Sequence, residues 1–457
     1  MNTLIAIGGL AVLVLIAEII NLRKFIIPIT VVGLLGILGL TINDFGLEAT
    51  YFNNMIVVNN FSTAFNALFI VLTIFLVTLS GDFYKNQYSK LSDYISLKLF
   101  LLMGAVSMVN FGNMAMFFLG LEILSISLYI LAGSNRKDIR SNEAGMKYFL
   151  LGSFASGLVL FGIAFIYGAT ATFDIGEIFT LALAGGLPQW YQLGVLLIVI
   201  GMLFKIAAVP FHFWAPDVYQ GAPTLTTTLM STLAKVVAVA TLYKLSVVLT
   251  PTMPETYTTA IIFISILTMS VGNIMALRQE NIKRLLAYSG ISHAGFMMMA
   301  LTNLSQAESS LFYYATAYAV AGIAAFTIVI IVCRGHKEEL IEQFNGLNKR
   351  SPLLAAIMSI ALLSMGGIPI FAGFFGKFFL FTQALDKGYI TLVIFGVLNS
   401  IISIYYYFKV ILVMYTKEVQ ENTQELEIPL TYKVVGVLTV LINILIGLYP
   451  SFLLDIF

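Results

Sequence analysis

The stretches GMLFKIAAVPFHFWAPD (201–217) and LLSMGGIPIFAGFFGKFFLF (362–381) are apolar and are interrupted by residues that weaken helices. The first contains Pro210, and the second contains Gly366, Gly367 and Pro369. Proline removes a backbone donor and glycine lowers helix stability, so we expect both helices to be kinked or broken. Backbone groups freed in an apolar stretch need protein or water partners, which places these breaks inside a helical bundle.

The composition indicates what surrounds this bundle. Of 457 residues, 59% are hydrophobic and 10% are charged, against about 25% charged residues in ordinary soluble domains. The mean hydropathy is +0.95. A soluble chain this apolar cannot cover its surface with polar groups, so we expect the outer surface to face lipid. The sequence therefore predicts an all-α integral membrane protein.

The apolar segments predict about fourteen transmembrane helices, since crossing the hydrocarbon core as a helix takes about 20 apolar residues. The segments are 3–22, 25–43, 64–81, 93–109, 111–133, 147–168, 193–213, 222–249, 258–277, 283–302, 310–333, 353–384, 389–415 and 432–455. No linker or low-complexity tract separates them. We therefore predict that residues 1–457 form a single polytopic membrane domain.

The two interrupted stretches belong to the seventh and twelfth segments. An odd offset between them means that they run in opposite directions, which is what inverted-topology repeats produce. We expect peripheral N-terminal helices in 1–92, a first repeat in 93–249, a second repeat in 258–415 and a final helix in 432–455.

The basic residues of the loops predict the orientation of the chain. Loops after odd-numbered segments hold nearly all of the loop lysines and arginines, and loops after even-numbered segments hold only Lys387. Basic loops stay in the cytoplasm. We therefore expect both termini to lie on the outer side of the membrane.

Residue counts exclude several kinds of site and partner. A single cysteine, Cys333, excludes a disulfide framework and a cysteine-ligated iron–sulfur cluster. Three histidines provide few possible ligands for haem or a metal ion, so we expect no metal site and no cofactor bound by this chain. The net charge of +1 argues against nucleic acid as a partner.

Four charged residues lie deep within apolar segments: Glu122, Lys205, Lys235 and Lys377. A charge at the centre of a bilayer costs at least about 2.5–3.5 kcal/mol, so such residues are seldom kept without a task. Desolvation disfavours the charged form of a lysine, which allows buried lysines to lose and regain protons. We interpret these residues as a proton relay. Sodium coordination would favour several clustered carboxylates, and only one deep carboxylate is present.

Other interpretations remain open at this point. Glu122 and one lysine can form a static pair that fixes helix packing, although this explains one lysine at most. His293 lies within a segment and is a candidate relay member because histidine titrates near neutral pH, but a neighbouring serine can equally satisfy it. Three further lysines near segment ends are expected to extend to water: Lys98, Lys244 and Lys409.

Four stretches resemble a known family, the antiporter-like membrane subunits of respiratory complex I and their relatives in multisubunit cation/proton antiporters. They are FLGLEILSISLYILAG (118–133), FKIAAVPFHFWAPDVYQGAPT (204–224), KRLLAYSGISHAGFM (283–297) and LLSMGGIPIFAGFFGKFFLF (362–381). The resemblance covers most of the chain, and the block around Lys205 and Pro210 is highly specific.

The resemblance implies roles for the residues already singled out. The glutamate of the family's fifth segment falls on Glu122, and the lysines of its seventh and eighth segments fall on Lys205 and Lys235. Its twelfth-segment basic residue falls on Lys377. Protons would pass from the cytoplasm to Lys205, through water and Lys235, with His293 as a candidate, and leave by Lys377.

Three antiporter-like subunit types occur in this family. The family's second type usually has glutamate where this chain has Lys377, and its longest type continues into a lateral helix beyond the fourteenth segment. The chain is therefore expected to be of the third type.

The resemblance also implies a setting for the chain. It would be a non-redox subunit of an NADH:quinone oxidoreductase in a bacterial inner membrane. NADH, FMN, iron–sulfur clusters and quinone would be bound elsewhere in the complex, and other membrane and peripheral subunits would be its partners. A subunit of a multisubunit sodium/proton antiporter and a membrane-bound hydrogenase arm are the alternatives.

Overall fold

The computed structural model describes residues 2–85, 90–251, 255–419 and 426–457. Within them, helices dominate, and one short antiparallel hairpin pairs β1 (Ala49–Tyr51) with β2 (Ile56–Val58). The chain forms two compact units. Unit 1 comprises residues 1–207, 233–260 and 457, and unit 2 comprises residues 208–232 and 261–456. The repeat boundaries expected from the sequence remain a prediction, and residues 1 and 86–89 of the expected N-terminal part lie outside the described residues.

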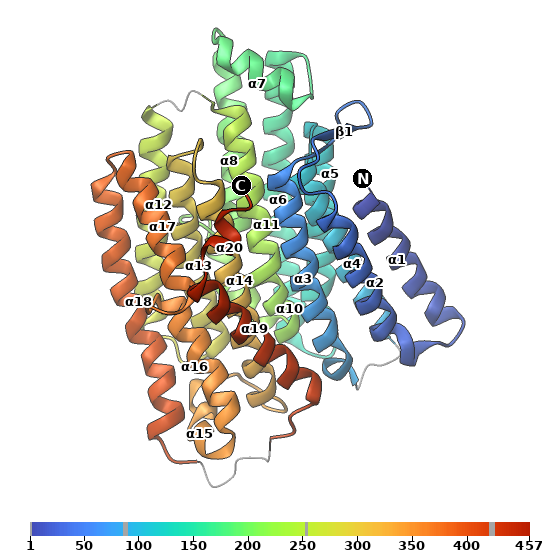
Figure 1. The fold of residues 1–457 in the computed structure, drawn as a ribbon, viewed down its shortest axis with the longest axis vertical. Coiled ribbons are helices and arrows are strands. Elements are labelled where there is room, and N and C mark those ends of the chain that lie inside the picture. The colour runs from blue at the N-terminus through green and yellow to red at the C-terminus, as the bar shows by residue number, and fades with distance from the viewer. Residues whose placement is uncertain (1, 86–89, 252–254, 420–425) are drawn as a thin grey trace. The chain divides into compact units, whose positions relative to one another are not determined.

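Unit 1 is built from a series of long helices and one short one, α7 (Figure 1). They are α1 (Asn2–Ile19), α2 (Ile26–Ile42), α3 (Asn60–Phe83), α4 (Leu91–Asn110), α5 (Met114–Ala132), α6 (Ile139–Thr170), α7 (Ile175–Ala184), α8 (Gln189–Ile206) and α11 (Lys235–Leu249), with the 3-10 turn η1 (Arg23–Phe25) before α2. Helix α1 packs on α4, α2 on α3, and α6 on α8. The α6–α8 contact depends on small residues, because a Cβ at Gly162 would lie 2.7 Å from the Gly194 carbonyl oxygen.

Unit 2 is arranged around α14 (Glu308–Val332), which is buried along its length and packs against α10, α16, α17 and α19. The other elements of this unit are α9 (Trp214–Gly221), α10 (Thr224–Leu229), most of α12 (Glu255–Ala276), α13 (Ile282–Met298), η4 (Met299–Thr302), η5 (Ile341–Phe344), α15 (Leu347–Arg350), α16 (Pro352–Gly366), α17 (Ala372–Asp386), α18 (Ile390–Thr416), α19 (Leu430–Leu448) and α20 (Ser451–Leu454).

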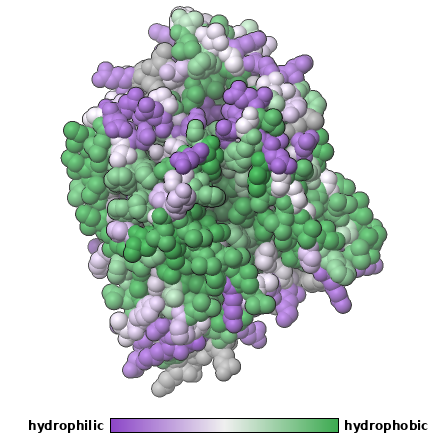
Figure 2. Space-filling view, viewed as in Figure 1, coloured by the Kyte–Doolittle hydropathy of each residue, from purple (hydrophilic) through white to green (hydrophobic). Residues whose placement is uncertain are grey.

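The described helices confirm the prediction of an integral membrane fold. Thirteen of them are long and apolar enough to cross a membrane. They coincide with all the predicted segments except the twelfth, which the structure divides into α16 and α17. Hydrophobic side chains cover α1 and, in the other unit, the exposed side of α18 (Figure 2). These are the faces that lipid would cover.

Both predicted helix breaks are present. Helix α8 ends at Ile206, Ala207 has a left-handed backbone with φ of 59°, and helical structure resumes at Trp214. Helix α16 ends at Gly366, Gly367 has φ of 83°, and α17 begins at Ala372. In both the seventh and the twelfth segment, the helix before the break is thus followed by a residue in the left-handed conformation.

A third irregularity was not predicted. The eighth segment is helical from Thr224 to Leu249, but residues Met230–Ala234 form a π-helical turn, η3. This turn ends immediately before Lys235, the first residue of α11. π-turns inside α-helices are frequent at functional sites.

Candidate functional site

Lys205 lies in the last turn of α8, where its ammonium binds two hydroxyl groups of α5. Its Nζ donates to Ser125 Oγ at 2.7 Å and to Tyr129 OH at 3.3 Å. It also lies 5.6 Å from the centre of the Tyr129 ring. The Ser125 hydroxyl donates its own hydrogen to the carbonyl of Leu121, at 2.5 Å, which leaves its lone pairs for Lys205. The Lys205 ammonium is therefore bound by two neutral hydroxyl groups, whose hydrogens can exchange.

Glu122 lies on the same face of α5 as these hydroxyls, because residues 122, 125 and 129 follow the helical spacing i, i+3, i+7. Its carboxylate interacts electrostatically with Lys205. Within the described residues, however, Glu122 forms no ion pair within 4.0 Å, and its Oε1 atom is buried without a hydrogen-bond partner. The static ion pair considered from the sequence is thus not formed, and Glu122 acts on Lys205 at longer range.

Lys235 is 2% exposed and lies in the same unit as Lys205. Its helix, α11, packs against α8 and α4. The π-turn of residues Met230–Ala234 immediately precedes it. The sequence located Lys235 correctly in an interior segment, and the structure adds the distortion beside it.

A cavity of about 540 Å³ opens to the surface of unit 1 and reaches the Lys205 site. Polar residues form part of its wall: Lys90, Asp93, Tyr94, Ser134, Arg136 and Asn142. Tyr129 lines the same cavity, and its hydroxyl accepts a hydrogen bond from Lys205. Ser125 and Tyr129 were not identified from the sequence as site residues, although their spacing from Glu122 was available as a signal.

Unit 2 holds Lys377, which is 3% exposed. Its Nζ donates to the Gly366 carbonyl at 3.0 Å and to Ser400 Oγ at 2.8 Å. Gly366 is the last residue of α16, so the ammonium lies at the negative end of a helix dipole. A Cβ on Gly367 would lie 3.1 Å from Lys377 Cδ, so glycine is required there both by its left-handed backbone and by the lysine.

His293 lies in the same unit and connects tyrosines of two other helices. Its Nδ1 is 2.7 Å from Tyr314 OH, on α14, and its Nε2 is 3.1 Å from Tyr407 OH, on α18. Tyr407 also hydrogen-bonds Ser289, one turn before His293 on α13. These hydroxyls satisfy the histidine, where a neighbouring serine had been considered. Tyr314 and Tyr407 were missed from the sequence because each comes from a distant segment.

Phe296 and Tyr314 lie between His293 and Lys377. The Lys377 ammonium is 4.8 Å from the centre of the Phe296 ring, and this ring is 6.3 Å from that of His293. Tyr314 packs against Gly376, the residue before Lys377. The two predicted site residues of unit 2 are therefore neighbours, separated by aromatic rings.

One of the three remaining interior lysines, Lys98, differs from expectation. Lys98 is 1% exposed, and its Nζ lies 4.8 Å from the centre of the Tyr84 ring. The prediction that Lys98 extends to water is therefore wrong. Lys244 donates to the carbonyls of Val109 and Phe111, both at 2.7 Å, and thereby caps the end of α4. Its nearest partners are backbone groups because the C-terminal carbonyls of a helix lack partners of their own. Lys409 is partly exposed and lies 3.4 Å from the Gln279 carbonyl.

In the part of the chain that the structure describes, no group of three or more histidine, cysteine, aspartate or glutamate side chains is placed to hold a metal ion. The site residues present lysines, hydroxyls, a histidine and a carboxylate, and each of these groups can donate or accept hydrogen bonds.

The fold and the site define a class of protein: polytopic helical membrane proteins whose broken helices lie beside buried lysines. A family model described as "NADH:quinone oxidoreductase/Mrp antiporter, TM" matches residues 112–403. NADH-quinone oxidoreductase subunit N of Flavobacterium johnsoniae is 58% identical, and the alignment covers all of both chains. The chain belongs to the subunit N family of antiporter-like membrane subunits, the third type, which Lys377 favoured.

Solved structures agree with this assignment. A chain of respiratory complex I from Thermus thermophilus is 28% identical, with a TM-score of 0.87 and coverage of 99% of this chain and 98% of that one. A chain of the Mrp complex from Dietzia sp. is 19% identical, with a TM-score of 0.85 and coverage of 99% and 94%. At 19% identity, the likeness to the Mrp chain shows a shared fold and no more.

Proposed function

We propose that the chain is the proton-translocating, non-redox subunit N of a bacterial NADH:quinone oxidoreductase. Its strongest structural support is the contact between the Lys205 ammonium and Tyr129, a residue that also lines an open cavity. A buried lysine joined to water by a hydroxyl can exchange protons with the aqueous phase. The 58% identity to a subunit N favours this function over that of an antiporter component, to which the likeness is one of fold.

In this proposal, protons reach Lys205 from the cytoplasm through the cavity and Tyr129. Glu122 attracts the Lys205 ammonium and stabilises its positive charge. The proton then moves from Lys205 to Lys235 through water. His293 and its tyrosine partners relay the proton in the second unit, and Lys377 releases it toward the outer side. The order of these steps comes from the family resemblance.

The setting follows from the same assignment. The chain lies in the bacterial inner membrane with both termini on the outer side, beside other membrane and peripheral subunits of complex I. NADH, FMN, iron–sulfur clusters and quinone are bound by those other subunits, and their redox reaction supplies the free energy for proton movement. This chain contributes the route for the proton and no electron carrier.

The test is replacement of Lys235 by alanine in the intact complex. We expect Lys235→Ala to assemble with its partners and to lower proton pumping in inverted membrane vesicles by at least about tenfold, because an ammonium relay is removed at a buried position. Lys433→Ala changes an exposed lysine at the start of α19 and serves as the control. Full pumping by an assembled Lys235→Ala complex would refute the relay.

The identity of the complex is tested separately. Affinity purification of the tagged chain in mild detergent should recover proteins that carry flavin and iron–sulfur clusters, together with NADH:quinone activity. Recovery of antiporter subunits without redox proteins would move the same relay into a sodium/proton exchanger. Recovery of nickel-bearing subunits would instead indicate a hydrogenase arm.

A further inference from the structure

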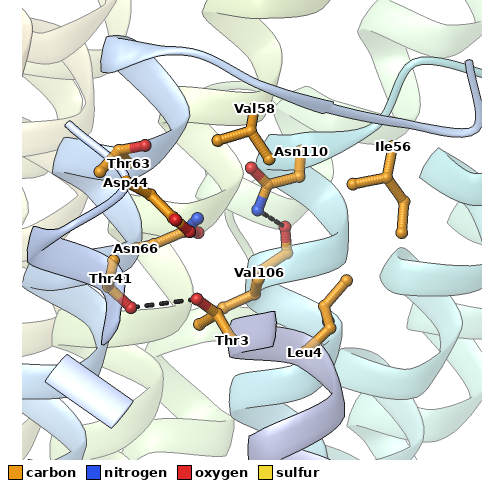
Figure 3. Close-up of a pocket in the computed structure, with 10 residues that line it drawn as sticks. All are labelled: Thr3, Leu4, Thr41, Asp44, Ile56, Val58, Thr63, Asn66, Val106 and Asn110. Atoms are coloured by element: carbon orange, nitrogen blue, oxygen red, sulfur yellow. Dashed lines mark hydrogen bonds between the residues drawn. The ribbon is translucent and has the colours of Figure 1, made fainter. Parts of the chain in front are cut away.

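Two cavities away from the lysine sites differ in what they can hold. A small one of about 10 Å³ lies in unit 1, beside the first turns of α1 and α3 and the end of α4 (Figure 3). Its volume admits one water molecule, and its walls offer both donors and acceptors, such as the Thr63 hydroxyl and the Asn66 amide, so it needs no other ligand. The other, of about 290 Å³, lies in unit 2 and reaches the lower end of the range of small-molecule sites.

The cavity of unit 2 combines an apolar inner wall with basic side chains near its mouth. Ile331 and Val332, the last residues of α14 to line it, are buried. Arg334 and His336 follow in the next turn and are exposed, whereas Arg350 ends α15 and is half-buried. Two separate elements of unit 2 thus bring three basic side chains to one concave space.

The turn after α14 brings two of these side chains to the cavity. Gly335 has a left-handed backbone with φ of 83°, and the His336 amide donates to the Cys333 carbonyl at 3.1 Å. The Arg334 amide donates to the Ile331 carbonyl at 3.4 Å. Two carbonyls at this end of α14 therefore have partners, which weakens the negative pole that a helix C-terminus presents to an anion.

The cavity has a net positive charge. The two arginines contribute +2 and Glu427, which also lines the cavity, contributes −1, so the sum is +1 when His336 is neutral. Among the residues that the structure describes, neither Arg334 nor Glu427 forms an ion pair within 4.0 Å. The acidic residue therefore does not neutralise the exposed arginine directly.

These side chains favour a phosphate group as the ligand. A guanidinium carries five N–H donors in a planar fork that matches two phosphate oxygens, and a histidine ring adds a further N–H. Burial lowers the pKa of the Arg350 guanidinium, and a partly desolvated cation attracts an anion more strongly because water screens it less. A phosphodiester carries one negative charge, which the net charge of +1 balances, whereas a phosphomonoester carries about −1.5 to −2 at pH 7.

An exposed apolar stripe begins next to the cavity in the sequence. Helix α19 starts at Leu430, three residues after Glu427. Its exposed apolar residues follow the helical spacing i, i+4, i+8, i+11, i+15 and so share one face: Leu430, Val434, Leu438, Leu441 and Leu445. An acyl chain on this face would accompany a phosphate in the cavity, so the two parts of a phospholipid each find a matching surface.

We propose that this cavity binds the headgroup of an anionic phospholipid, with the phosphate against Arg334, His336 and Arg350 and an acyl chain along α19. Glu427 accepts hydrogen bonds, so a headgroup that carries hydroxyl groups beside its phosphate, as phosphatidylglycerol does, also gives this carboxylate a partner. In the orientation expected from the basic loops, the lipid belongs to the cytoplasmic leaflet. The site does not depend on the lysine relay, and failure of either proposal leaves the other intact.

The test uses the purified complex in phosphatidylcholine nanodiscs that contain, as a minor component, phosphatidylglycerol with a photoreactive acyl chain. After irradiation, mass spectrometry of the peptides gives the lipid attached to α19 relative to that attached to α1, whose exposed apolar residues serve as the internal reference. We expect this ratio to exceed one in the wild type. It should fall about tenfold or more in the double variant Arg334→Gln/Arg350→Gln, because hydrogen bonds between charged groups are lost.

Two single variants complete the design. Lys349→Gln removes an exposed basic residue beside Arg350 that does not line the cavity, so it should keep the wild-type ratio. Arg334→Gln changes an exposed side chain and keeps the fold if the double variant does not assemble. It should lower the ratio about threefold, the scale of an exposed charge pair.

Two changes of probe separate the lipid from its alternatives. Photoreactive phosphatidylcholine with the same acyl chains has no net charge and should label α19 no more than α1. Inorganic phosphate, added to the phosphatidylglycerol nanodiscs at constant ionic strength, should leave the labelling of α19 unchanged.

Three results would overturn the proposal. Equal labelling of α19 in the wild type and in Arg334→Gln would exclude the cavity as the headgroup site. Equal labelling by the two lipids would mean that α19 contacts bulk lipid only, and displacement of the label by inorganic phosphate would mean that the cavity takes free phosphate.

Discussion

Removal of the Ser125 hydroxyl tests the Lys205 site most directly. In the wild type, Lys205 Nζ donates to Ser125 at 2.7 Å and to Tyr129 at 3.3 Å, so the serine contact is the shorter of the two. Ser125→Ala leaves the ammonium with the longer contact alone. The substitution removes one oxygen atom and adds no bulk, so α5 keeps its packing.

The expected magnitude follows from the kind of hydrogen bond. A hydrogen bond to a charged group contributes about 1.5–3 kcal/mol, and every 1.4 kcal/mol changes an equilibrium about tenfold. If protonated Lys205 is an obligatory state, the equilibrium constant for its protonation falls by about 10- to 100-fold in Ser125→Ala, and pumping falls as the protonated population is lost. The long-range attraction of Glu122 is unchanged and limits the loss.

The assay is proton uptake by inverted vesicles energised with NADH, with complex content quantified for each variant. Ser127→Ala is the matched control, because Ser127 lies on the same helix and its hydroxyl donates to the Ile123 carbonyl at 2.8 Å. The control should pump at the wild-type rate. Wild-type pumping by a fully assembled Ser125→Ala complex would refute the assignment of Lys205 as a protonated intermediate.

Two other substitutions test unit 2. Gly367→Ala should lower the midpoint of thermal unfolding in detergent more than Gly388→Ala does. Both glycines have left-handed backbones, which cost other residues about 1–2 kcal/mol, but only Gly367 has Lys377 against the new Cβ. Equal losses of midpoint temperature would show that the Lys377 side chain moves aside without cost. Tyr407→Phe removes the hydroxyl at 3.1 Å from His293 and should slow proton pumping about fivefold, the equivalent of one neutral hydrogen bond of about 1 kcal/mol. Tyr405→Phe changes an exposed ring and should pump normally. Equal pumping rates in the two variants would exclude His293 from the relay.

The sequence was sufficient to predict the membrane fold, because lipid imposes strict requirements on length and composition. A stretch that crosses a bilayer must be about 20 residues long and largely apolar, and such stretches are visible without any tertiary information. The breaks after Ile206 and Gly366 were also predictable, since proline and glycine mark them in the residue string. The π-turn at residues 230–234 was not, because MSTLA contains neither residue and the distortion comes from packing.

The site was predictable in its charges and unpredictable in its neutral groups. Burial makes a charge expensive, so Glu122 and the interior lysines stand out in an apolar sequence. Serine and tyrosine carry no such penalty when hydrogen-bonded, and membrane helices contain many of them. Tyr407 became a site residue only when folding brought α18 beside His293 of α13. Lys98 shows the converse error, since its position near a segment end suggested water contact that packing against Tyr84 prevents.

The partners of each lysine distinguish a proton-exchanging group from a fixed cation. A carbonyl only accepts hydrogen bonds, so it favours an ammonium and offers nothing to a neutral amine, whereas a hydroxyl can accept from the ammonium or donate to the amine. Lys244 has two carbonyl partners, Lys205 has two hydroxyls, and Lys377 has one of each. At Lys205 the Ser125 hydroxyl already donates to the Leu121 carbonyl, so Tyr129 is the partner whose hydroxyl can accept from the ammonium or donate to the amine, as the proposed relay requires. In the proposed relay, Lys377, which lies at the carbonyl end of α16, is the last site before release.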